Sequence, residues 1–188
     1  EDDGGAGAVS ASMLQLKTEA LERFAIIRAI HVKMQKALQS KGPHDKAYLK
    51  LQQQVSDELL NIRFTSRSIE RLCDSVRGMV DLVRGSERKI QQICVDRVKM
   101  PRPHFIQSFP GNEVNLDWAD GEIAAAPKTY VAILTRNGPA IKEEQKKLLA
   151  LQDRIGIPLK DLKDINKQMS TGEAKARRAK REMTEANL

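Results

Sequence analysis

The sequence is poor in aromatic residues and cysteines, and it contains no long apolar run. Phe, Trp and Tyr make up 4% of its 188 residues, whereas hydrophobic residues make up 40% and charged residues 30%. This balance is typical of helical proteins with aliphatic cores. No apolar stretch approaches the roughly 18 residues that a membrane-spanning helix needs, and the start EDDGGAGAVS lacks the basic-then-apolar order of a signal peptide. We therefore expect a cytoplasmic protein with no membrane partner.

The same scarcity leaves little material for catalysis or metal binding. The three histidines, His31, His44 and His104, lie in separate segments and have no second ligand at a Glu-x-x-His or His-x-x-x-His spacing. Cys73 and Cys94 lie on one predicted helix, about 30 Å apart, too far to form a disulfide with each other. We expect buried reduced thiols, a core or edge position for His31, no enzymatic activity and no cofactor or metal.

The net charge of +7 raises the question of nucleic-acid binding. The basic residues do not cluster, because acidic residues alternate with them throughout the middle of the chain. This mixture is more typical of solvated helix faces than of a DNA-binding surface. The shortage of aromatic rings also argues against a platform that stacks the bases of single strands.

Apolar residues recur every three or four positions, which predicts helices throughout the chain. The acidic, glycine-rich residues 1–9 suggest a flexible linker. We predict helices over about 10–40, 44–62 and 66–100, with a bend or exposed turn near 84–87 and an end at Pro101. A helical signal returns from Pro127, breaks at Asn137-Gly138-Pro139 and then continues to Gly156, and a short helix follows over about 158–169.

Two short segments carry three of the seven aromatic residues. Phe105, Ile106 and Phe109 lie in one, and Leu116 and Trp118 lie in the other. Packing against the end of a helical bundle is favoured over an exposed contact site for a partner. Because no convincing strand pattern is present, the predicted fold is all-α: a helical bundle with long antiparallel helices and short plugging segments.

The terminal stretch GEAKARRAKREMTEANL predicts a strong helix that the sequence does not end. Ser170 and Glu173 have the S-x-x-E spacing of a capping box, which indicates a helix start. A narrow apolar face follows, and the sequence has no glycine, proline or basic last turn to stop the helix. The apolar face consists of Ala176, Ala179, Met183 and Ala186.

This stretch resembles the start of the second conserved region of primary, or housekeeping, bacterial sigma factors of the sigma-70 family. The preceding KDLKDINKQMSTGEAK (160–175) is similar to the family's approach to that region. VDRVKMPRPHFIQSFPGNE (95–113) resembles the large helical insertion that many primary sigma factors carry between their first and second conserved regions.

The resemblance implies a fragment of a transcription initiation factor that binds core RNA polymerase and directs it to promoters. Residues 10–170 would form the insertion, near the β′ subunit, and residues 171–188 the start of the core-binding region. Promoter DNA would be read by parts of the parent protein outside these residues, and regulators of sigma are possible further partners. A free-standing helical adaptor remains the alternative. Candidate contacts to polymerase or the DNA backbone, with solvated helix charge as the competing interpretation, are Arg177, Arg178, Lys180 and Arg181.

Overall fold

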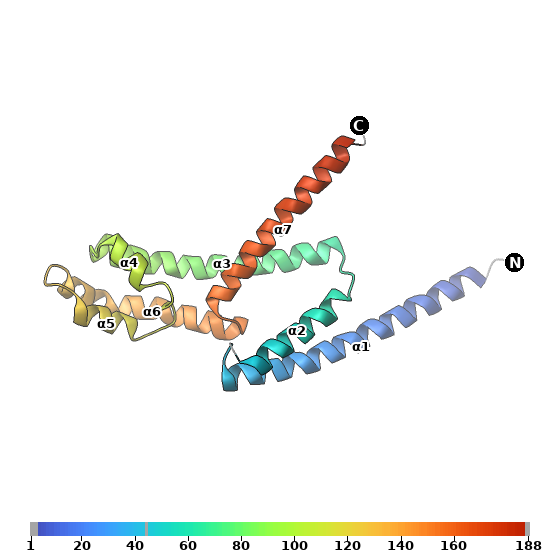
Figure 1. Ribbon diagram of the computed structural model, residues 1–188, viewed down its shortest axis with the longest axis horizontal. Coiled ribbons are helices and arrows are strands. Elements are labelled where there is room, and N and C mark those ends of the chain that lie inside the picture. The colour runs from blue at the N-terminus through green and yellow to red at the C-terminus, as the bar shows by residue number, and fades with distance from the viewer. Residues whose placement is uncertain (1–3, 44, 187–188) are drawn as a thin grey trace. The chain divides into compact units, whose positions relative to one another are not determined.

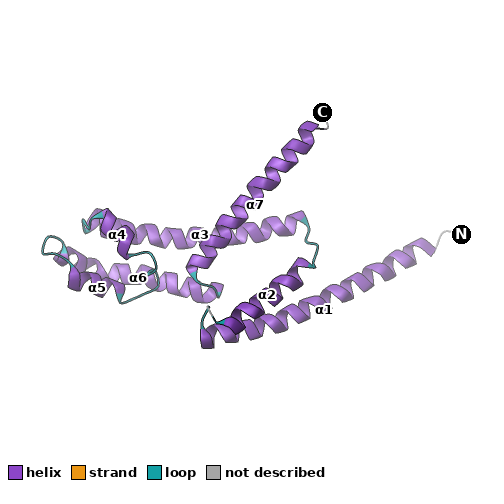
Figure 2. Cartoon of the chain, viewed as in Figure 1, coloured by secondary structure: helices purple, strands orange, loops and turns teal. Residues whose placement is uncertain are grey.

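The computed structural model describes the backbone of residues 4–43 and 45–186, and the side chains of residues 12–43 and 45–186. Every regular element in these ranges is helical, which confirms the predicted all-α fold (Figure 2). The chain divides into two compact units, residues 1–65 and 66–188.

The first unit is a hairpin of two helices, α1 (Gly4–Lys41) and α2 (Lys46–Leu60), which pack side by side in Figure 1. Gly42, with a φ of 85°, makes the turn in a conformation that favours glycine. Asp45 then caps α2, because its carboxylate accepts hydrogen bonds from the backbone N–H groups of Ala47 (2.9 Å) and Tyr48 (3.4 Å). The structure confirms the two helices predicted over about 10–40 and 44–62.

Two predictions for the first unit need correction. The backbone of residues 4–9 is helical, whereas the sequence suggested a linker over residues 1–9; residues 1–3 lie outside the described part. His31 is exposed beside Gln35 and is not a core residue. The unit has a thin core, because Met34 and Tyr48 are the buried apolar side chains among its described residues.

The second unit is built on the long helices α3 (Ser66–Gln91) and α6 (Val131–Ile155), which run antiparallel and in contact (Figure 1). The short helices α4 (Arg102–Ser108) and α5 (Trp118–Ala125) lie at one end of this pair. The last helix, α7 (Leu159–Ala186), packs against α3 through its first half. These helices enclose the main core of the protein.

The helix predicted over 66–100 begins at Ser66 as expected. Its departure from regular α-helix lies at residues 92–97 and not at the predicted 84–87. The backbone is helical through residues 84–87 and Ser86 is buried, so the exposed turn that the sequence offered as an alternative to a bend does not occur there. The chain instead widens into a π-helical segment, η1 (Gln92–Arg97), which places Cys94 and Val98 in the core. Cys94 is buried, as predicted, whereas Cys73 is only partly buried. Both thiols are free.

The sequence predicted that two short segments pack their aromatic residues against the end of the bundle; we call this cluster the aromatic plug. The packing is confirmed for Phe105, Phe109 and Trp118. The rings of Phe105 and Phe109 stack at 4.9 Å, and Trp118 meets Phe109 edge to face at 5.0 Å. All three side chains are buried, whereas Ile106 is exposed. Gln145 of α6 holds the loop between Phe109 and Trp118. Its buried amide donates to the backbone carbonyls of Asn112 (3.0 Å) and Asn115 (2.8 Å).

The break predicted at residues 137–139 does not occur, since α6 continues through Pro139. Pro139 lacks the backbone N–H that would donate within the helix, so it costs one hydrogen bond, and the residue is exposed. Gly138 is buried against α5, where an added Cβ would lie 3.3 Å from Cδ1 of Ile123. This close approach of two helices explains why the glycine is tolerated within α6.

Candidate partner-binding surface on the terminal helix

The terminal helix α7 is one uninterrupted helix, and it does not start where the sequence suggested. It begins at Leu159, so the short helix predicted over 158–169 and the helix predicted from Ser170 are the same element. The predicted capping box is therefore wrong. Thr171 lies inside the helix, where its hydroxyl donates to the backbone carbonyl of Lys167 (2.9 Å), and Glu173 is used for a contact with α3.

The first half of α7, residues 159–173, is held against the rest of the second unit; we call it the basal half. Leu159 and Leu162 are buried in the core, 3% and 2% exposed. The side chains that are at least half-buried recur at three- and four-residue steps, as a helix packed along one face requires. They are Leu159, Leu162, Lys163, Asn166, Met169 and Glu173.

Ion pairs hold the basal half at two positions along α7, Lys163 and Glu173. Lys163 pairs with Glu87 of α3 and lies 3.5 Å from Glu113 in the loop after α4. Near the far end of the half, Arg77 of α3 joins Glu173, and it also pairs with Asp74 at 2.6 Å. The basal half is thus tied to α3 by charge as well as by apolar packing.

The contact at Glu173 also changes how its neighbours titrate. The hydrogen bond and positive charge of Arg77 lower the pKa of the Glu173 carboxyl. Burial raises the pKa of the nearby Cys73 thiol, and the negative charge of Glu173 raises it further. Cys73 is therefore held as a neutral thiol beside an ionised carboxylate.

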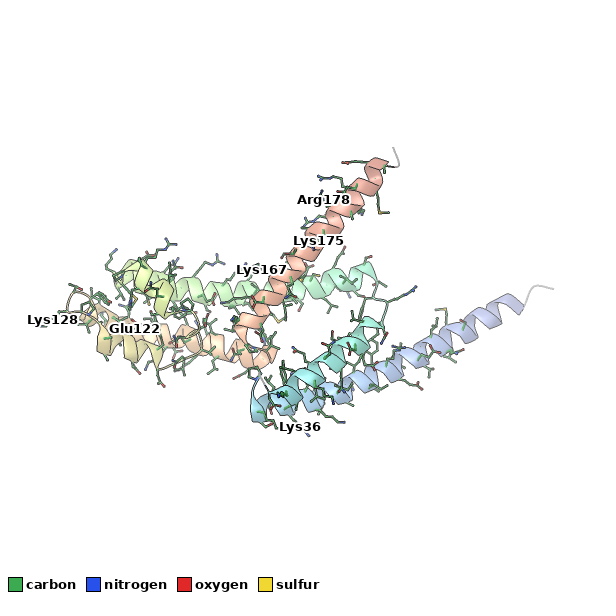
Figure 3. The ribbon with its side chains drawn as sticks, viewed as in Figure 1. Lys36, Glu122, Lys128, Lys167, Lys175 and Arg178 are labelled. Carbon is green, nitrogen blue, oxygen red and sulfur yellow. The ribbon has the colours of Figure 1, made fainter. Side chains whose placement is uncertain are left out.

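The second half of α7, residues 174–186, has a different environment; we call it the distal half. All of its residues are exposed, and Met183 is 67% exposed. Figure 1 shows this half extending past α3, and Figure 3 shows the side chains of Lys175 and Arg178 projecting from it. The predicted apolar face is therefore uncovered in this unit at all four of its residues, Ala176, Ala179, Met183 and Ala186.

The four basic residues predicted as contacts all lie on the distal half, but they divide into two pairs. Arg178 pairs with Glu182 at 2.8 Å and Arg181 with Glu185 at 3.8 Å, within the helix. Arg177 and Lys180 instead line an open groove of about 630 Å³ between α3 and α7. Ile69, Cys73 and Ala176 are apolar parts of the same groove. Their role as contacts stays a prediction.

The described residues contain neither a metal-binding cluster nor a membrane span. Within these ranges, no three His, Cys, Asp or Glu side chains gather closely enough to hold a metal ion. No helix in the described ranges combines the length and the apolar character needed to cross a bilayer. The described fold and surface define an all-α protein whose terminal helix presents an exposed apolar and basic face.

Comparison with known proteins identifies the family. Residues 1–152 match the model of the family described as "Sigma-70, non-essential region". The chain is also 37% identical over 179 residues to the RNA polymerase sigma factor RpoD of Neisseria gonorrhoeae. This alignment covers 95% of the chain and 28% of the relative, so the chain spans little more than a quarter of that protein's length. The chain belongs to the sigma-70 family, which confirms the assignment made from the terminal stretch.

Proposed function

We propose that this chain is the helical insertion, together with the first core-binding helix, of a primary sigma factor. In this role the parent protein binds core RNA polymerase in the cytoplasm and directs it to promoters. The contribution of the chain is binding and not catalysis. The family match over residues 1–152 supports this function over a free-standing helical adaptor.

The distal half of α7 carries the proposed contact with core polymerase. One observation supports this most directly: a well-formed helix keeps an apolar face of Ala176, Ala179 and Met183 exposed, although its basal half is packed. A helix with an uncovered apolar stripe gains free energy when a partner covers it. The basic residues beside the stripe, including Arg177 and Lys180, would add electrostatic attraction to an acidic partner surface.

We further propose that the polymerase contact lies on its β′ subunit and that promoter DNA is read by other parts of the parent protein. The interleaved charges of the described helices agree with this division, since isolated ion pairs such as Arg178–Glu182 reduce the attraction to phosphate. Regulators of sigma remain candidate partners on the same exposed surface.

A matched pair of substitutions tests the contact. Ala179→Asp places a charge on the apolar face of the distal half, and Ala174→Asp places the same charge on the opposite face. Both residues are exposed, so neither substitution should disturb the core. We expect Ala179→Asp to weaken binding to core RNA polymerase by about tenfold in a titration with labelled chain, because a charge would be desolvated in the interface. Equal affinities for the two variants would reject this face as the contact.

A further inference from the structure

A separate cavity of about 380 Å³ lies in the second unit, between α3, α4 and the basal half of α7. Its size is in the lower range of sites that bind small ligands or single side chains of a partner. It shares no lining residue with the groove beside the distal half. A ligand in this cavity would therefore be distinct from the proposed polymerase contact.

The inner wall of the cavity is apolar and preformed. It includes the stacked rings of Phe105 and Phe109, which are 6% and 4% exposed, and Pro110. Trp118 contacts both rings, with its ring centre 6.2 Å from Phe105 and 5.0 Å from Phe109, and does not line the cavity. Because packing holds these rings in place, the cavity does not need to reorganise to accept an apolar group.

The charged residues around the cavity are unequally paired. Lys163 pairs with both Glu87 and Glu113, so one ammonium group is shared by two carboxylates and these three side chains keep a net charge of −1. Arg84 and Arg88 lie one turn apart on α3, and within the described residues neither forms an ion pair. Arg88 donates from Nε to the backbone carbonyl of Arg84 at 3.2 Å, which leaves its terminal guanidinium nitrogens available.

We propose that this cavity binds an acidic peptide segment of a partner protein, with an apolar side chain against the two phenylalanine rings and a neighbouring carboxylate on Arg84 and Arg88. Two guanidinium groups one turn apart match the oxygens of a carboxylate, and such charge-assisted hydrogen bonds are the stronger kind. The apolar wall favours an apolar side chain beside the carboxylate, because burying that side chain removes apolar surface from water.

A peptide fits these features better than a nucleic acid does. The charged side chains that line the cavity sum to +1, which matches a single carboxylate better than a run of phosphates. They are Arg84, Arg88, Lys163, Glu87 and Glu113. The two rings reach the cavity only with small exposed edges, 6% and 4% of each residue, which can contact one aliphatic side chain but are too small to stack a base. One carboxylate beside one apolar side chain avoids both problems.

The test uses the whole chain and two probe peptides, N-acetyl-Leu-Glu-amide and its uncharged counterpart N-acetyl-Leu-Gln-amide. Titration to millimolar concentrations is followed by NMR at the arginine Nε–H groups and the aromatic rings. We expect Leu-Glu to shift signals of Arg84, Arg88 and Phe105, and to bind about tenfold more tightly than Leu-Gln because it adds a charge-assisted contact. Equal binding of the two peptides, or no shift at these residues, would overturn the proposal.

A double substitution separates this site from general electrostatic attraction. Arg84→Gln with Arg88→Gln removes the two exposed guanidinium groups and should abolish the preference for Leu-Glu. Arg67→Gln with Arg71→Gln removes the same charge from exposed positions of the same helix and should leave binding unchanged. Equal losses in both double variants would contradict a specific site. So would a short DNA duplex that shifts the Arg84 and Arg88 signals more strongly than the peptide.

Discussion

The two halves of α7 share one continuous helix but differ in every contact that they make. The basal half buries Leu159 and Leu162 and forms ion pairs through Lys163 and Glu173. The distal half keeps the same three- and four-residue repeat of small and apolar residues, yet all of it is exposed. The difference shows that an apolar stripe identifies a surface suited to packing but does not identify what covers it.

The largest expected difference between the halves concerns stability. Leu162→Ala in the basal half should lower the free energy of unfolding by about 2–4 kcal/mol, because it leaves a cavity at a side chain that is 2% exposed. Met183→Ala in the distal half should change it by less than about 0.5 kcal/mol, since that side chain is 67% exposed. Urea unfolding followed by Trp118 fluorescence measures both. Similar losses would mean that the distal half is also packed in solution.

A smaller effect is expected from the ion pairs. Lys163→Met should destabilise the second unit by about 1 kcal/mol, because it leaves Glu87 and Glu113 without their partially buried partner. Lys175→Met removes the same charge from the exposed distal half and should have almost no effect. If the two variants unfold at the same urea concentration, the Lys163 contacts do not hold the basal half.

The smallest effect concerns the reactivity of Cys73. Glu173→Gln removes a negative charge that raises the pKa of the Cys73 thiol, so more thiolate forms at a given pH. We expect labelling by a thiol reagent at mildly alkaline pH to become about two- to fivefold faster, a change typical of losing one nearby charge at a partly solvated site.

Cys94 is the internal control for that measurement. Burial raises its pKa to about 12, and its side chain is fully buried, so it should remain unlabelled in the folded chain of both variants. An unchanged Cys73 rate in Glu173→Gln would show that the two side chains are not in contact in solution. Fast labelling of Cys94 would instead indicate that the variant has unfolded.

The sequence predicted the helices and the aromatic plug because both follow from local patterns. The repeat of apolar residues is sufficient for α3, and the shortage of aromatic residues made Phe105, Phe109 and Trp118 conspicuous. The same local rules failed where distant contacts decide. Glu173 forms an ion pair with Arg77, which is 96 residues away, and Gly138 packs closely against Ile123 of α5. Neither partner could be inferred from spacing.

The candidate site was predictable only in part. The resemblance of the terminal stretch located Arg177, Arg178, Lys180 and Arg181 on a helix, and the structure confirms that they are helical and exposed. It could not show that two of them pair within the helix whereas Arg177 and Lys180 line a groove. The groove depends on how α3 and α7 diverge, and no local signal encodes that geometry.

The most direct test of the proposed function compares core RNA polymerase binding by the whole chain and by a chain that ends at Met169. Truncation removes the distal half and the last four residues of the basal half, including Glu173, but keeps Leu159 and Leu162. Trp118 fluorescence checks that the core remains folded. If the distal half carries the contact, the shortened chain should lose core polymerase in a pull-down, with affinity reduced by about tenfold or more. Retention of the polymerase by the shortened chain would contradict this account and place the contact within the insertion.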